Sequence, residues 1–437
     1  MKRVLVITYY WPPSGGGGVQ RWLKMSKYLP QQGWQPVIFT PENPHFDLRD
    51  ETLLQDEHPE TEVIRYPIWE PYRIYDRIFG KKGNAGLIGG GKRKRNWKDK
   101  LLSLVRSWFL IPDPRVFWVK PAVKHLTAYL REHPVDAIVT TGPPHSMHLI
   151  GLGLKKKLGT YWIADLRDAW TQLDYLKDFH LTKAAIRKQE KMEQEVVKAA
   201  DRVLIVTKNL ADWHTELYGR PVEVLTNGFD APDFEEVPAH NKDRFIISHF
   251  GLLNNFRNPG VLWRVLNEYC EANPAFAERL ELRLGGVVDP SVRAEIDQLP
   301  LLRERVHYYD YVSHEDVIAL NAESAILLLC INNTYLGRYF MTGKIFEYLA
   351  LGRPILCMSD KGSDAAQVIR ETGTGATFDY EAGEASAIRA WLEKQFEQFP
   401  ALAYEANEEE IARYSRENLS AQVVQMIEDG LILKKQD

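Results

Sequence analysis

Cysteine is scarce in this chain. Only Cys270, Cys330 and Cys357 occur among the 437 residues, and their number is odd. They lie far apart and lack the spacing typical of metal ligands, so neither a complete disulfide framework nor a cysteine-based metal site is expected. This usage indicates a reducing compartment, and we expect a cytoplasmic location.

Long apolar runs are also missing. No stretch approaches the roughly 20 apolar residues that a membrane-spanning helix requires, so we expect no transmembrane helix. The N-terminal run VLVITYYW is interrupted by Tyr9 and Tyr10 and stopped by Pro12-Pro13, and no small-residue cleavage site follows it. These features argue against a signal peptide.

The net charge of −4 shows no strong excess of either sign, but one segment departs from it. In Lys81 to Lys100, KKGNAGLIGGGKRKRNWKDK, eight Lys and Arg residues stand against Asp99 alone, and an amphipathic stretch follows. We predict a basic insertion over residues 80–111. It is either a solvated surface insertion or a segment that binds reversibly to an anionic membrane. Each basic residue near such a membrane can contribute about 1 kcal/mol to the free energy of binding. Nucleic acid is a weaker reading because the rest of the chain is acidic overall.

Short β-rich apolar runs alternate with helical patterns over most of the chain. The expected strands of the first half are RVLVIT, QPVIFT, TEVIRY, VDAIVTTG, TYWIADL, DRVLIVT and VEVLT. They are continuously apolar, as strands of a parallel sheet covered on both faces are. Amphipathic stretches such as Val19 to Leu29 and Leu181 to Ala200 lie between them. This order predicts a doubly wound α/β domain.

A turn-rich segment, Asn227 to Asp243, interrupts the pattern, which then resumes. The later runs FIISHFG, ELRLGG, RVHYYDYV, AILLLCI, RPILCMS and GATFDY predict a second parallel α/β unit. We therefore predict an N-terminal domain over residues 1–238 and a C-terminal domain over residues 239–412. Residues 413–437 are expected to form a helix that crosses back to the first domain.

Four consecutive glycines, Gly15 to Gly18, separate the first strand from the first helix. A helix N-terminus offers unpaired N–H groups to an anion, and glycines let the backbone approach it closely. The spacing is neither the dinucleotide fingerprint nor a Walker P-loop. A phosphate-binding loop and a tight flexible turn both remain open.

The segment from Tyr339 to Ser359, YFMTGKIFEYLALGRPILCMS, carries the strongest signal. Thr342 and Gly343 are expected to open a helix, with Lys344 in its first turn and Glu347 on the same side. A cation there opposes the helix dipole, so a bound anion that offsets this conflict is a reasonable inference. The alternative is an exposed Lys/Glu pair worth a few tenths of a kcal/mol.

These motifs resemble those of the family-4 glycosyltransferases, glycosyl transferase group 1, over nearly the whole chain. YYWPPSGGGGVQR is similar to the family's Pro-Pro and Gly-Gly loop, VEVLTNGFD to its Asn-Gly turn, and GKIFEYLALGRPIL to its Lys, Glu and Ala-x-Gly-x-Pro segment. IADLRDAW occupies the place of the family's Arg-Asp segment. The resemblance implies the GT-B fold, two Rossmann-like doubly wound domains that face each other across a cleft.

The resemblance also implies donor-side roles. Glu347 would bind the ribose hydroxyls of a nucleotide-diphosphate sugar, and Arg257 and Lys344 would bind the diphosphate. The remaining donor contacts would come from Gly16, Gly17, Gly18, Tyr311, Val312, Thr342 and Gly343.

Two further roles concern the transferred sugar and its acceptor. Asp168 matches the polar residue beside the anomeric carbon, where it would steady positive charge or orient the acceptor hydroxyl; a helix cap ahead of Ala169 is its alternative. His145 would line the acceptor side, although a structural role is equally open.

One position departs from the family pattern, because Tyr339 stands where a first Glu usually contacts donor-sugar hydroxyls. The family otherwise implies transfer with retention of anomeric configuration. The chain contains no D-x-D motif, so we expect fixed cations rather than a metal ion, and no cofactor. The acceptor would be a saccharide or a lipid-linked molecule of cell-surface polysaccharide or lipopolysaccharide synthesis, reached from the inner face of the membrane. A non-hydrolysing sugar-nucleotide epimerase and a catalytically silent binding scaffold remain alternatives.

Overall fold

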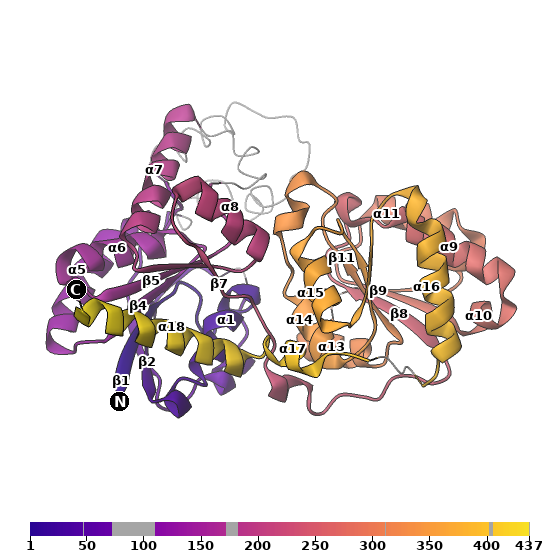
Figure 1. Cartoon of the computed structure of the whole chain (residues 1–437), viewed down its shortest axis with the longest axis horizontal. Coiled ribbons are helices and arrows are strands. Elements are labelled where there is room, and N and C mark those ends of the chain that lie inside the picture. The colour runs from indigo at the N-terminus through magenta and orange to yellow at the C-terminus, as the bar shows by residue number, and fades with distance from the viewer. Residues whose placement is uncertain (47, 72–109, 172–181, 311, 402–404, 437) are drawn as a thin grey trace. The chain divides into compact units, whose positions relative to one another are not determined.

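The chain forms two compact units in a computed structural model (Figure 1). The structure describes residues 1–436 except 47, 72–109, 172–181, 311 and 402–404. The N-terminal unit comprises Met1–Thr226 and Leu419–Asp437, and the C-terminal unit comprises Asn227–Asn418. Most of the basic insertion predicted for residues 80–111 lies outside the described residues.

A seven-stranded parallel sheet organises the N-terminal unit, in the order β3-β2-β1-β4-β5-β6-β7. Its interior strands are buried along most of their length, which explains their continuously apolar sequences. The strands are β1 (Lys2–Ile7), β2 (Trp34–Pro41), β3 (Glu62–Tyr66), β4 (Ala137–Thr141), β5 (Tyr161–Arg167), β6 (Arg202–Ile205) and β7 (Glu223–Val224). All seven predicted runs are confirmed as strands.

Helices cover both faces of this sheet. They are α1 (Gly17–Ser26), α5 (Val116–Glu132), α6 (Ser146–Leu158), α7 (Lys183–Ala199), α8 (Lys208–Tyr218) and α18 (Arg416–Gln436), with short helices η1 (Pro30–Gln32) and η2 (Thr52–Asp56). Val4 and Val6 pack in one core cluster with residues of α1 and α18. Phe39 of the neighbouring strand faces the opposite way and stacks on Trp118 of α5, with ring centroids 4.9 Å apart.

The last helix, α18, packs against the N-terminal unit, as the sequence predicts. Val423 and Ile427 are buried in its core. Tyr161 of β5 donates a hydrogen bond to the Met426 carbonyl, and Lys2 pairs with Glu428 at 2.6 Å. The apolar face of α18 is therefore buried against the core of the N-terminal unit.

The C-terminal unit contains a six-stranded parallel sheet in the order β10-β9-β8-β11-β12-β13. Its strands are β8 (Phe245–Phe250), β9 (Leu280–Gly285), β10 (Val306–Tyr309), β11 (Ile326–Cys330), β12 (Ile355–Met358) and β13 (Gly375–Phe378). All six predicted runs are again confirmed. The chain thus has two Rossmann-like doubly wound α/β units, which confirms the predicted fold class.

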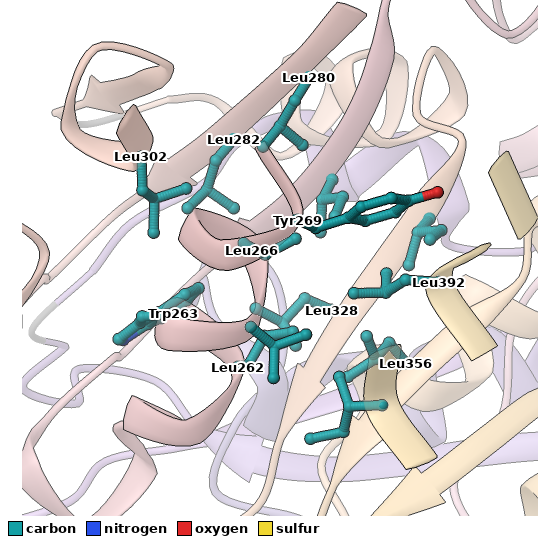
Figure 2. Packing of buried hydrophobic residues seen from close by; sticks show 14 of the residues in the cluster. Leu262, Trp263, Leu266, Tyr269, Leu280, Leu282, Leu302, Leu328, Leu356 and Leu392 are labelled. Atoms are coloured by element: carbon teal, nitrogen blue, oxygen red, sulfur yellow. The ribbon is translucent and has the colours of Figure 1, made fainter. Parts of the chain in front are cut away.

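Two core clusters lie on the two faces of this second sheet. One face is covered by α9 (Gly260–Ala272), α10 (Pro274–Arg279), α11 (Pro290–Asp297), α12 (Pro300–Arg303) and α16 (Ala385–Gln398). In Figure 2, Leu262 and Leu266 of α9 lie close to Leu328 of the sheet and Leu392 of α16. The other face is covered by α13 (His314–Ala322), α14 (Lys344–Leu351) and α15 (Asp364–Thr372), with α17 (Glu408–Ala412) beside them. The described part of the unit also contains the short helices η5 (Ala231–Phe234), η6 (Asn255–Arg257), η7 (Tyr335–Tyr339) and η8 (Ala382–Glu384).

The division between the units falls after Thr226, earlier than the predicted residue 238. The turn-rich segment belongs to the C-terminal unit because Phe229, Phe234 and Val237 pack against its second core cluster. These three apolar side chains attach the turn-rich segment to the core of the C-terminal unit, although most of its other residues are turn formers. At the other end, Leu419 rather than residue 413 begins the returning part of the chain.

Each sheet reverses its strand order once, between β1 and β4 and between β8 and β11. In open α/β sheets, ligands bind outside the carboxyl ends of the strands at this reversal. The four-glycine loop follows β1, and the Arg257 loop follows β8. The fold therefore places a predicted site segment at the reversal point of each unit. Among the described residues, no helix has the length and apolarity needed to span a membrane.

Candidate functional site

In the C-terminal unit, α14 begins at Lys344, where the sequence predicts a helix start. Its N-cap is Gly343, an exposed residue with open space where a Cβ would stand. Glu347 lies in the first turn, and Gly352 ends the helix in the left-handed conformation at φ 60°. The local sequence thus forms a short helix, and the first residue of this helix is the positively charged Lys344.

The Lys344 side chain lies against the loop that follows β8. A Cβ built on Gly251 would fall 1.7 Å from Lys344 Nζ, and Gly251 has φ 150°, which disfavours other residues. Glycine at position 251 therefore makes room for the ammonium group. This packing brings Lys344 to the reversal point between β8 and β11.

Arg257 is held at the same point and belongs to the loop that follows β8 itself. Its Nε donates to Asn332 Oδ1 at 2.5 Å, which joins the loop after β8 to the loop after β11. Asn254 caps the short helix η6 that carries Arg257, accepting from the Phe256 N–H at 3.1 Å. The guanidinium is therefore positioned by backbone capping and by one amide side chain.

Lys344 and Arg257 form a positive cluster that no carboxylate neutralises directly. Among the residues that the structure describes, neither makes an ion pair within 4.0 Å. Burial, and next the charge of Arg257, lowers the pKa of Lys344. His249 at the end of β8 is buried beside them, and burial together with the Lys344 charge lowers its pKa to about 3. Half-buried cations without a carboxylate partner, gathered in one place, are typical of an anion site.

Glu347 lies one turn along α14 from this cluster. Burial raises its pKa, while the nearby charges of His314 and Lys344 act in the opposite direction. None of the described residues donates a hydrogen bond to its carboxylate. A partly buried carboxylate with unused acceptor capacity can take hydrogen bonds from ligand hydroxyls.

The other donor-side predictions fall around α14 and β10. Thr342 is half-buried, and its Oγ1 lies 3.5 Å from the Lys344 backbone N–H that it accepts. Val312 is half-buried just after β10, whereas Tyr311 lies outside the described residues. Their contacts with a nucleotide stay predictions.

In the N-terminal unit, the structure explains the absence of a side chain differently at each of the four glycines of the loop. A Cβ at Gly15 would meet Leu48 at 2.9 Å, and a Cβ at Gly18 would meet Tyr10 at 2.9 Å. Gly16 caps α1 with φ 85°, whereas Gly17 has open space and no positive φ. Packing among the described residues of this unit therefore leaves the absence of a side chain at Gly17 unexplained, and the first N–H groups of a helix are those that can bind an anion.

Arg167 fixes this loop to the neighbouring one. It is buried at the end of β5, and its guanidinium donates to the carbonyls of Gly142 at 2.6 Å, Pro143 at 2.7 Å and Gly18 at 3.0 Å. Its φ of 58° is the only positive φ of a non-glycine residue in the described part of the chain. Such strain persists only where the surroundings determine it, and here three carbonyls do so.

Beneath Arg167, a buried ion pair ties α1 to β5. Arg21 Nε and Nη2 donate to the two Asp165 carboxylate oxygens at 2.8 and 2.9 Å, and both side chains are almost fully buried. Trp22 Nε1 and the Thr141 hydroxyl donate to the same carboxylate. This bidentate pair sets the direction in which α1 leaves the glycine loop.

Asp168 directly follows β5 and is not a helix cap, since no helix begins in residues 168–171. Its backbone N–H donates to the Leu166 carbonyl at 2.7 Å. Burial raises the pKa of its carboxyl group, and the charges of Arg167 and Arg21 oppose that effect. The carboxylate is thus held near the glycine loop's anchor, next to two cations.

His145 has a packing role. It precedes α6, is 8% exposed, and stacks on Trp170 with ring centroids 4.6 Å apart and an interplanar angle of 7°. Burial lowers its pKa well below 6.5, so the ring is neutral. Its assignment to the acceptor side stays a prediction.

Sequence reasoning missed the residues that position the predicted ones. Arg167, Asn332, His249 and Gly251 lie at strand ends or in the loops that follow them. A signal existed only for Arg167, which stands in the Arg-Asp segment whose role was assigned to Asp168. The predicted residues divide between the units: the glycine loop, Asp168 and His145 belong to the N-terminal unit, and the others that are described belong to the C-terminal unit.

The sequence model of the glycosyl transferase 4-like domain matches residues 16–228. A search of curated protein sequences gave no match.

Solved structures are similar over the full length at low sequence identity. Sucrose-phosphate synthase from Thermosynechococcus elongatus is 14% identical, with a TM-score of 0.60 over 98% of this chain and 99% of that chain. WaaG, a glycosyltransferase involved in lipopolysaccharide biosynthesis, is 15% identical, with a TM-score of 0.52 over 97% and 99%. A putative UDP-N-acetylglucosamine 2-epimerase from Listeria monocytogenes is 13% identical, with a TM-score of 0.55 over 98% and 96%. These similarities confirm the predicted GT-B fold.

Proposed function

We propose that this chain transfers a sugar from a nucleotide-diphosphate donor to an acceptor hydroxyl, because residues 16–228 match the sequence model of the glycosyl transferase 4-like domain. The reaction would retain the anomeric configuration, with the acceptor attacking from the face that the nucleotide leaves. The observation that carries the proposal is the pair Arg257 and Lys344, two cations at the reversal point of the second sheet.

The departing diphosphate needs most of the stabilisation in this reaction. Glycosyl transfer passes through an oxocarbenium-like transition state, in which negative charge grows on the leaving group. Arg257 and Lys344 would each donate charge-assisted hydrogen bonds to it, worth about 1.5–3 kcal/mol apiece. They are held before the donor arrives, by Asn332 and by the space at Gly251, so little reorganisation is required.

The remaining donor contacts follow from the same unit. Glu347 would accept hydrogen bonds from the two ribose hydroxyls, and Gly343 with Thr342 would face the phosphates. Val312 and Tyr311 would pack against the base. From the N-terminal unit, Gly16, Gly17 and Gly18 would add backbone N–H groups to the phosphates or sugar.

Asp168 is the proposed catalytic carboxylate of the N-terminal unit. It would steady the positive charge on the ring or orient the acceptor hydroxyl. Its backbone is fixed by the neighbouring Arg167, which we assign as a positioning residue because it holds the glycine loop through the Gly18 carbonyl. His145 would act on the acceptor side only through packing.

We propose no metal ion and no cofactor for this reaction, because fixed cations occupy the position where a metal clamp would otherwise be needed. The acceptor is a saccharide or a lipid-linked molecule, and the protein works in the cytoplasm or at the inner face of the membrane. The lipopolysaccharide role of WaaG supports this setting. Co-sedimentation with anionic liposomes, with and without residues 81–100, tests the membrane part; equal binding would count against it.

A donor panel tests the proposed function. UDP-, GDP-, ADP- and dTDP-sugars are screened by ligand-detected NMR against wild type, Glu347→Ala and Lys361→Met, an exposed lysine of the same unit that pairs with Glu384. Binding to wild type and Lys361→Met but not to Glu347→Ala supports the site. Conversion of the bound donor into a new sugar nucleotide without acceptor would instead indicate an epimerase. Binding with no turnover of any donor, with or without acceptors, would indicate a silent scaffold.

A further inference from the structure

A buried histidine with an unpaired ring nitrogen lies beside the cation pair of the C-terminal unit. His249, next to the last residue of β8, is 1% exposed. Its Nδ1 lies 2.9 Å from the Leu328 carbonyl of the neighbouring strand β11. Among the residues that the structure describes, its Nε2 has no hydrogen-bond partner. Buried polar atoms of native proteins are nearly always paired, so this nitrogen requires an explanation.

The protonation of the ring makes Nε2 a hydrogen-bond acceptor. Burial, and next the charge of Lys344, lowers the pKa of His249 to about 3, so the ring is neutral near pH 7. A neutral imidazole carries a hydrogen on one nitrogen and a lone pair on the other. The Leu328 carbonyl can only accept, so the hydrogen is on Nδ1 and the lone pair is on Nε2.

A donor lies next to this lone pair. The Cβ built on Gly251 falls 1.7 Å from Lys344 Nζ and 3.9 Å from His249 Nε2, so the two nitrogens are separated by no more than the sum of these distances. An ammonium group has three hydrogens and ends a flexible four-carbon chain. A small movement of the end of the Lys344 side chain therefore brings one hydrogen to Nε2.

The other described groups near Lys344 do not offer an equivalent acceptor. Arg257 is a cation, and burial raises the pKa of Cys330 to about 12, which keeps its thiol protonated. In the described part of the chain, Glu347 makes no ion pair with Lys344 within 4.0 Å. The Leu252 carbonyl already accepts from Arg257 Nη1 at 3.4 Å. The His249 ring is therefore the acceptor best placed for the ammonium group.

We infer that His249 is a positioning residue for Lys344, in which Nε2 accepts one ammonium hydrogen and directs the other two toward the bound diphosphate. This inference rests on the proposed donor site. A carboxylate in the same place would neutralise the cation and compete with the diphosphate for it. A neutral imidazole instead holds the ammonium group and leaves its full positive charge to the anion.

Two substitutions separate the roles of the two ring nitrogens. Asparagine places its amide near Nδ1, so His249→Asn keeps a donor for the Leu328 carbonyl and removes the acceptor. Glutamine reaches the position of Nε2, so His249→Gln keeps an acceptor near Lys344. Affinities for UDP, GDP, ADP and dTDP are measured by isothermal titration calorimetry. His249→Asn should weaken binding of the nucleotide that binds wild type by about 5- to 20-fold, and His249→Gln should recover most of this loss.

A double-mutant cycle tests whether His249 acts through Lys344. In the Lys344→Met background, His249→Asn should change affinity by less than about threefold, because the group that it holds is already absent. An equal loss in both backgrounds overturns the inference, since His249 would then act on the fold or on the ligand itself. Affinity of His249→Asn within about threefold of wild type also overturns it. The control His307→Asn replaces an exposed histidine of the same unit and should leave affinity unchanged.

A second measurement needs no substitution at His249 and decides the matter if those variants do not fold. Nitrogen-15 NMR of histidine-labelled wild type and Lys344→Met, both without nucleotide, compares the ring nitrogens. One unprotonated Nε2 resonance should shift when the ammonium group is removed, and the absence of any such shift overturns the inference. Failure of wild type to bind every nucleotide refutes the proposed function, whereas wild-type binding with an additive cycle refutes only the role of His249.

Discussion

Replacing Lys344 with methionine should weaken donor binding while leaving the empty protein as stable as before, or more stable. The two effects have opposite signs because Lys344 is held in an unfavourable place. Its ammonium group is largely withdrawn from water, lies near the positive Arg257, and has no carboxylate within pairing distance in the described part of the chain. Methionine has a similar length and no charge, so it fills the same space beside Gly251.

The loss of affinity can be worked out from one charge-assisted hydrogen bond. Such a bond contributes about 1.5–3 kcal/mol, which corresponds to about a 10- to 150-fold increase in Kd for the nucleotide diphosphate. The gain in stability comes from removing a desolvated, repelled cation. Substitutions that relieve functional sites commonly add about 0.5–2 kcal/mol, or roughly 2–4 °C in Tm per kcal/mol for a domain of this size.

The sign of the pH effect follows from the lowered pKa of Lys344. Between that pKa and the ordinary 10.5, the unfolded chain binds more protons than the folded one, so stability rises with pH in this window. Below the lowered pKa the full penalty is present in wild type. The advantage of Lys344→Met should therefore be greatest at neutral pH and shrink as the solution becomes alkaline.

Calorimetric titration with the nucleotide that binds wild type, together with thermal unfolding without ligand, measures both effects. Lys361→Met is the matched control, because Lys361 is exposed and pairs with Glu384; it should leave affinity unchanged. Affinity of Lys344→Met within about threefold of wild type would refute the diphosphate role. A fall in Tm of several degrees that accompanies lost binding would instead show that Lys344 supports the fold.

Gly17→Ala should leave Tm unchanged or slightly raised, because Gly17 has no positive φ, but it should reduce turnover because the added methyl group faces the donor. Gly16→Ala, at φ 85°, should instead lower the free energy of unfolding by about 1 kcal/mol. Equal turnover in Gly17→Ala and wild type would contradict the loop's role. Arg21→Met should cost about 3–5 kcal/mol in urea unfolding because it leaves Asp165 buried and unpaired. Adding Asp165→Asn should restore part of this loss, and no recovery would argue against the pair as its cause. Nucleotide affinity should fall as pH drops through the raised pKa of Glu347, at a pH above the ordinary 4.5, because the protonated acid accepts ribose hydrogen bonds poorly. Glu347→Gln should flatten this dependence in titrations across the acidic range, and an unchanged profile would exclude Glu347 as the titrating group.

The secondary structure was predictable because each strand is a continuous apolar run bounded by turn formers. The same logic placed α14, since Gly343, Lys344 and Gly352 mark its ends in the sequence itself. The boundary between the units was predicted too late. Turn residues dominate the composition of 227–243, while Phe229, Phe234 and Val237 carry the packing that assigns it.

The candidate site was predictable only in part. Arg257 and Lys344 were found through motifs, but neither Asn332 nor Gly251 has a local pattern that reveals its purpose. Asn332 matters because the parallel strands β8 and β11 are neighbours in the sheet, so Asn332 meets Arg257 although 75 residues separate the two in sequence. Arg167 is similar, since its three carbonyl partners come from two other loops.

The amino-acid order by itself determined the alternation of strands and helices, the starts and ends of helices, and the identity of the charged groups, because periodicity and capping act over a few residues. Only the tertiary structure decided which loops meet at the reversal of each sheet. It alone shows that Lys344 and Arg257 share an unneutralised positive cluster, and that Arg167 is strained and Asp165 is paired. These properties depend on burial and on distances between segments remote in sequence, which no local pattern encodes.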